Sequence, residues 1–190
     1  MALHSVVLTL VLPLWIAAQT SAPQAVVSAV LVTNAILTVL LTVRISAQAE
    51  NALTAARAMR RAGLVLAVAM LLYPVSAWLG TGGSVALLLA TVVYTVGDLF
   101  HATAAAGLAY ELARPDALGQ YQGVNGLVNG LAQAVGPAVL TLLLIHGRAA
   151  GWIALAVVLV AAGLATPVLT RHALGSHPPY QTPAAPVVSR

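Results

Sequence analysis

Asp98 is the residue of this sequence with the clearest capacity for chemistry, because it is an acid that follows a long uncharged segment. Residues 62–97 contain no Asp, Glu, Lys or Arg, and Thr91, Tyr94 and His101 surround Asp98 at helical spacing. In a helix these four side chains share one face. A carboxylate at the centre of a bilayer costs about 2.5–3.5 kcal/mol on insertion scales, so it needs compensation. Two interpretations remain open: Asp98, His101 and Tyr94 relay protons, or Asp98 and His101 only anchor the helix near the interface.

A second polar pattern follows about 25 residues later, where four amide side chains recur at intervals of three and four residues. They are Gln122, Asn125, Asn129 and Gln133. This spacing predicts one amide-lined helix face, which either lines a cavity or hydrogen-bonds to a neighbouring helix. Asn34, with Thr38 and Thr42, forms a weaker stripe of the same kind, for which interhelical hydrogen bonding is the simpler interpretation.

Glycines line an adjacent face of the same segment, with the small-x-x-x-small spacing that allows membrane helices to approach closely. They are Gly119, Gly123, Gly126 and Gly130. We interpret this stripe as a helix-packing surface.

Enzymatic chemistry is not expected. The sequence has no cysteine, no His-Glu-x-x-His zinc motif and no phosphate-binding Gly-Lys-Ser/Thr loop. The five histidines, at positions 4, 101, 146, 172 and 177, have no metal-ligand spacing. We therefore predict neither a catalytic site nor a metal or other cofactor.

The elements that must position these residues are membrane-spanning helices. Hydrophobic residues make up 61% of the chain and charged residues 6%, whereas a soluble domain has about a quarter charged. Uncharged stretches of the required length of roughly 20 residues predict an all-α membrane protein, since backbone groups in lipid must be satisfied within the segment. Six spans are expected, at 5–18, 25–43, 62–79, 84–106, 121–145 and 151–170. Residues 1–171 would form one bundle, and the Pro-rich residues 172–190 a disordered cytoplasmic tail.

The eight basic residues are all arginine, and their distribution predicts the orientation. With the N-terminus in the cytoplasm, only Arg148 lies outside and the other arginines lie inside, as the positive-inside rule requires. Both termini are then cytoplasmic, and the expected location is the plasma membrane. Residues 47–61 are expected to form a short interfacial helix with Arg57, Arg60 and Arg61 facing lipid phosphates. The basic residues form no patch suited to nucleic acid.

Several short motifs, in this order and spacing, resemble the C-terminal half of drug-efflux-like transporters of the major facilitator superfamily. They are LPLWI at 12–16, VGDLF at 96–100, YELARP at 110–115, GQYQG at 119–123 and VGP at 135–137. The resemblance covers about residues 1–171. It departs from the family at Leu118, where an arginine is usual, and in having six spans instead of twelve.

The resemblance implies a half bundle of two inverted three-helix repeats. It also implies cavity-lining roles for Trp15 and Gln19, packing at Gly136 and Pro137, and proton-coupled movement of a small solute or drug. Because one half cannot enclose a substrate, a homodimer or a separate N-terminal half is expected as the partner, in addition to the lipid bilayer. The rival interpretation is a truncated, non-transporting membrane protein that acts only through helix association.

Overall fold

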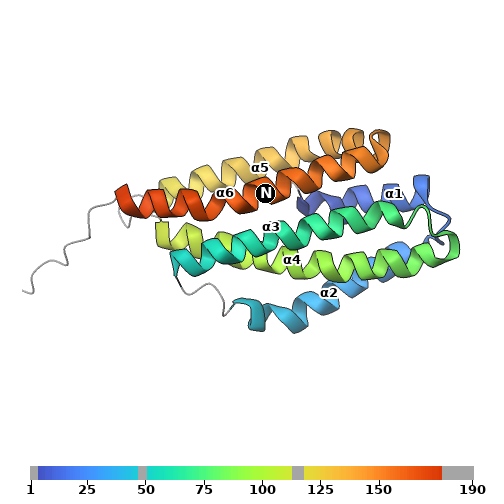
Figure 1. Ribbon diagram of the computed structural model, residues 1–190, viewed down its shortest axis with the longest axis horizontal. Coiled ribbons are helices and arrows are strands. Elements are labelled where there is room, and N and C mark those ends of the chain that lie inside the picture. The colour runs from blue at the N-terminus through green and yellow to red at the C-terminus, as the bar shows by residue number, and fades with distance from the viewer. Residues whose placement is uncertain (1–3, 47–50, 113–117, 177–190) are drawn as a thin grey trace, which may run out of the picture.

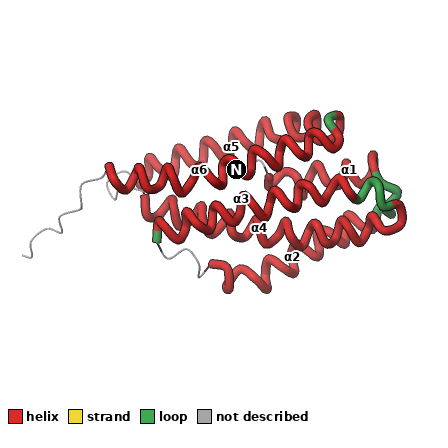
Figure 2. The backbone as a smooth tube through the Cα atoms, viewed as in Figure 1, coloured by secondary structure: helices red, strands yellow, loops and turns green. Residues whose placement is uncertain are grey.

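The computed structural model describes residues 4–46, 51–112 and 118–176. These residues form long helices and no strand, as Figure 2 shows. The major helices are α1 (Leu12–Gln19), α2 (Ala25–Ser46), α3 (Ala52–Val75), α4 (Gly83–Leu112), α5 (Leu118–Thr141) and α6 (Arg148–Ser176). Shorter turns are the π-helix η2 (Val7–Val11), the 3-10 turn η3 (Gly80–Gly82) and the π-helix η5 (Leu142–His146).

Five helices of the described chain are long and apolar enough to cross a membrane, which supports the prediction of an all-helical, multi-pass membrane protein. The first predicted span differs from the others: residues Val7–Gln19 form a shorter apolar helix. At 1.5 Å per residue it reaches only about 20 Å, less than the hydrocarbon thickness of about 30 Å. Pro13 in the first turn of α1 lacks an amide hydrogen, and the π-helix η2 directly precedes α1.

The predicted interfacial helix at 47–61 is wrong from residue 52 onward, because Ala52–Arg61 are the first turns of α3. Asn51 explains this start. Its side chain accepts hydrogen bonds from the backbone amides of Leu53 and Thr54, and its own amide donates to the Thr54 hydroxyl at 3.0 Å. This reciprocal capping box satisfies amides that a helix start leaves unpaired. Residues 47–50 lie outside the described residues.

The last helix extends beyond the expected boundary of the bundle at residue 171, because α6 continues to Ser176. Residues 172–176 are therefore helical, and 177–190 lie outside the described residues. Pro137 and Pro167 lie inside α5 and α6 without ending them, as expected for prolines in membrane helices.

The helices pack as a row in which consecutive long helices run in opposite directions (Figure 1). Helix α3 is central and packs against α4 and α6; α2 packs on the far side of α4. Helix α5 is attached mainly through η5 and through contacts with η2. The outer helices α2 and α5 therefore expose most of their apolar surface.

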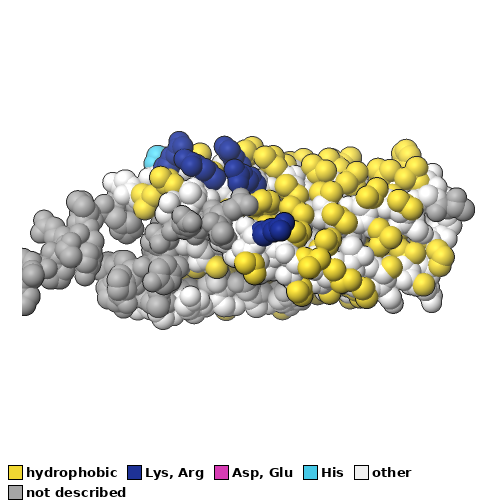
Figure 3. All heavy atoms as spheres, turned by 90° about the horizontal axis from the view of Figure 1, so that it is seen from below, with side chains coloured by type: hydrophobic (Ala, Val, Ile, Leu, Met, Phe, Trp, Pro, Cys, Tyr) yellow, Lys and Arg dark blue, Asp and Glu magenta, His cyan; other side chains and the backbone are white. Residues whose placement is uncertain are grey.

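The arginines of the described chain lie at the two ends of the helices, with most of them at one end. Figure 3 shows them in one half of the face it displays, with hydrophobic side chains over the rest. Arg44 lies in the last turn of α2, and the exposed Arg57, Arg60 and Arg61 lie in the first turns of α3, which begins shortly after α2 ends. Exposed Arg148 begins α6 at its opposite end, beside the turn from η5.

Helices α3 and α4 approach each other closely at Gly97. A Cβ atom built there would lie 2.8 Å from Leu66 Cγ and 3.0 Å from the Leu66 backbone nitrogen. The first distance is shorter than real Cβ atoms show and the second is unusually tight, so a side chain at residue 97 would force α3 and α4 apart, and glycine permits the approach.

We expect Gly97→Ala to destabilise the protein by about 1–3 kcal/mol, the typical cost of overpacking. Gly126→Ala is the matched control, because nothing lies within 4 Å of its Cβ position. Thermal unfolding in detergent measures both. Equal melting temperatures for the two variants would contradict the close α3–α4 contact.

Candidate functional site

The predicted stripe on α4 is confirmed as one face of the helix, and it points into the bundle. Thr91 and Tyr94 are buried, and Asp98 and His101 are partly buried. Helix α4 is continuous from Gly83 to Leu112, so the spacing between these side chains is fixed by the helix itself.

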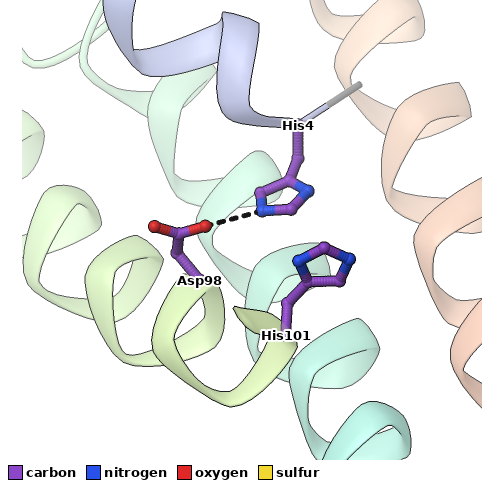
Figure 4. A group of neighbouring side chains, drawn as sticks. All are labelled: His4, Asp98 and His101. Atoms are coloured by element: carbon purple, nitrogen blue, oxygen red, sulfur yellow. Dashed lines mark hydrogen bonds and ion pairs between the residues drawn. The ribbon is translucent and has the colours of Figure 1, made fainter. Parts of the chain in front are cut away.

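The partner of Asp98 is His4, from the N-terminal segment. His4 Nε2 lies 2.8 Å from Asp98 Oδ1, as Figure 4 shows. The His4 side chain is 1% exposed and that of Asp98 is 36% exposed. The imidazole is thus enclosed by protein, while the carboxylate keeps one open side.

His101 completes the cluster. Its ring centroid lies 4.6 Å from that of His4, with the rings nearly perpendicular. In Figure 4 the two rings and the carboxylate converge from two elements, His4 from the N-terminal segment and the other two from α4. One ligand atom from each of the three residues lies within 4.8 Å of the others.

Tyr94 contacts the backbone of His4. Its hydroxyl donates to the backbone carbonyl of His4 at 3.0 Å. Tyr94 therefore holds the backbone that carries His4, and the hydrogen bond that the structure gives Asp98 is with His4. The predicted relay residues Tyr94, Asp98 and His101 lie close together, and Tyr94 contacts the backbone of His4 while Asp98 contacts its side chain.

Two more polar contacts connect this site to neighbouring helices. Thr95 donates to Asn34 Oδ1 at 2.9 Å, which joins α4 to α2. Asn34 was predicted as cavity-lining or interhelical, and it makes the interhelical hydrogen bond. Gln133 Nε2 on α5 donates to the Ser5 hydroxyl at 3.2 Å, one residue from His4.

A row of aromatic rings leads from the cluster into the core. Tyr94 lies between His4 and Tyr73, Tyr73 contacts Trp152, and Trp152 contacts Trp15 edge to face at 5.4 Å. Trp15 was predicted to line a cavity, but it is 2% exposed and packed in the core. The indole nitrogens of Trp15 and Trp152 are buried without a hydrogen-bond partner in the described chain. Gln19 is half-buried near the end of α1.

The amide face of α5 is exposed. Asn129 Nδ2 donates to the backbone carbonyl and the side-chain oxygen of Asn125, one turn earlier. Gln122 and Asn125 are exposed as well. Apart from the Gln133–Ser5 hydrogen bond, the hydrogen bonds found for these amides stay within α5.

The glycine stripe is open too. Nothing lies within 4 Å of the Cβ positions of Gly119, Gly123, Gly126 and Gly130. Among the residues that the structure describes, no side chain packs against this stripe. Gly136 is buried and Pro137 half-buried at the end of α5 that lies nearer the core.

Sequence reasoning missed His4 as a site residue, and it missed Gly97 as a packing residue. His4 lies 94 positions from Asp98, and no spacing rule connects them. A signal existed, however, since His4 is the only ionisable side chain in residues 1–43, and intramembrane ionisable residues are rare.

Comparisons with family models, with curated proteins and with solved structures found no match to this chain. The function must therefore be argued from the site.

Replacing Tyr94 by Phe should destabilise the protein by about 0.5–1.5 kcal/mol, because the buried hydrogen bond from the Tyr94 hydroxyl to the His4 carbonyl is lost. The matched control is Tyr73→Phe. The Tyr73 hydroxyl lies 3.4 Å from the Thr91 hydroxyl, a weak contact, and Thr91 also donates to the Leu87 carbonyl. Chemical or thermal unfolding compares them. A larger loss for Tyr73→Phe would contradict this account of Tyr94.

Proposed function

We propose that this chain is one half of an ion-coupled secondary transporter for a small solute or drug. The observation that carries the proposal is the His4–Asp98–His101 cluster within the helix row. Ionisable side chains inside membrane segments are costly and typically mark ion or substrate pathways. The partly open Asp98 carboxylate supplies an access side, and the buried His4 supplies a fixed partner. The sequence resemblance predicts a proton as the coupling ion and efflux as the direction.

The second support is the uncovered face of α5. Amides and glycines exposed along a membrane-spanning helix suit contact with another helix better than contact with lipid. A second half bundle, either a second copy or a separate six-helix chain, would cover this face and form the opposite wall of a cavity. The described chain has five helices long enough to span, so the proposed arrangement of two inverted triplets requires the short helix of residues 7–19 to serve as a partial sixth element that crosses only part of the hydrocarbon.

The same open face also supports a second candidate function. A membrane protein that acts only by helix association would use the glycine stripe and would have no need of the ion cluster. The two candidates differ in what Asp98 does, so a variant of Asp98 separates them.

Asp98→Asn should abolish ion-driven solute uptake in proteoliposomes while leaving folding intact, because the amide keeps size and polarity but loses the charge. Asp98→Glu should retain part of the activity, and exposed His172→Gln should retain all of it. Uptake is measured with whatever second half proves necessary for assembly. Full activity in Asp98→Asn would exclude Asp98 as the coupling residue and favour the association-only function.

The arginine distribution generates a topology prediction, with both termini in the cytoplasm of a cell whose plasma membrane holds the protein. The cysteine-free sequence allows single-cysteine labelling at exposed positions. An impermeant thiol reagent added to intact cells should label Ser21→Cys, in the loop after α1, and should label His172→Cys only after lysis. Labelling of the cysteine at 172 in intact cells would reverse the orientation.

A further inference from the structure

From the geometry of the cluster, we infer that His4, Asp98 and His101 bind a divalent transition-metal ion. The three side chains offer two imidazole nitrogens and one carboxylate oxygen within 4.8 Å of one another. This inference goes beyond the transport proposal, since metal binding can be measured at equilibrium without any transport.

The distances allow coordination with small side-chain rotations. Ligand atoms around a tetrahedral zinc ion with bonds of about 2.0–2.1 Å are separated by roughly 3.4 Å. The His4–Asp98 pair is already at 2.8 Å. His101 needs to approach from within 4.8 Å, and its side chain is only partly buried. The metal would replace the hydrogen bond between His4 Nε2 and Asp98 Oδ1, and the His4 ring would then carry its proton on Nδ1.

The ligand types select the class of ion. Two histidines and one carboxylate with an open position form the donor set typical of zinc and ferrous iron sites. Calcium and magnesium prefer all-oxygen sites. One carboxylate neutralises half of the charge of a divalent ion, and Asp98 is the only acidic side chain that the structure describes. The open side of Asp98 leaves a place for water or another ligand.

The surroundings hold the ligands in place. Asp98 and His101 are one helical turn apart on α4, so their spacing is set by the helix. The His4 backbone is fixed by the Tyr94 hydroxyl, and its neighbour Ser5 by Gln133. Outer contacts of this kind orient metal ligands and typically change affinity by 10- to 100-fold.

The test uses the full chain in detergent, purified without a polyhistidine tag. Because the chain has no cysteine, a cobalt spectrum reports nitrogen and oxygen ligands alone. We expect saturable binding of one Co²⁺ with visible absorption, its displacement by Zn²⁺ and not by Ca²⁺, and a raised melting temperature with Zn²⁺. His4→Gln and His101→Gln should weaken binding at least about tenfold.

His172→Gln and His146→Gln are the matched controls, because both histidines are exposed and far along the sequence from the cluster. Binding unchanged in both cluster variants, or weakened equally in the controls, would overturn the inference. If the cluster variants fail to fold, X-ray absorption of the zinc-loaded wild type decides, and a first shell without two imidazoles would overturn it. Metal binding with no ion-driven uptake would contradict the proposed transport and leave the metal site intact.

Discussion

The cost of placing a carboxylate among apolar helices is the constraint on which much of this structure depends. Asp98 follows a long uncharged segment, and an unpartnered acid there would cost several kcal/mol. Its partner, His4, is the first residue of the described chain, 94 positions away along the sequence. The N-terminal segment must therefore fold back onto α4, and the Tyr94 hydroxyl holds it there. The N-terminal segment that carries His4 continues into η2 and α1, and these elements pack beside α5 and η5.

The rotation of α4 about its axis is fixed by two adjacent residues that face different neighbours. Gly97 allows the backbone of α3 to approach at Leu66, and Asp98 turns toward His4. Successive helix positions are separated by about 100°. If Gly97 faces α3, Asp98 must therefore point about 100° away, toward His4, so both contacts fix the same rotation of α4. A third side of α4 is fixed by the hydrogen bond from Thr95 to Asn34 on α2. Membrane helices lack a strong hydrophobic force between them, and small residues and polar contacts are what hold them together.

Much of this architecture could be predicted from local sequence features. The uncharged stretches predicted the long apolar helices, and helical spacing predicted the shared face of Thr91, Tyr94, Asp98 and His101. The capping box at Asn51 was missed, although its residues are visible in the sequence, because the arginines after it suggested an interface. His4 could not be paired with Asp98 by spacing, since that contact depends on how distant segments pack. The same limit applied to Trp15, whose core position depends on Trp152.

Helix α5 links the site to the surface that a partner would cover. The hydrogen bonds of Asn125 and Asn129 stay within the helix, and the glycines from Gly119 to Gly130 have no described neighbour within 4 Å of their Cβ positions. This face is therefore suited to contact with a second helix. The end of this face, at Gln133, donates to Ser5, and Ser5 adjoins His4. A partner that moves α5 would therefore act on the backbone of the residue that pairs with Asp98. The exposed face of α5 is thus connected to the residue next to His4 by the Gln133–Ser5 hydrogen bond and by the packing of α5 against η2.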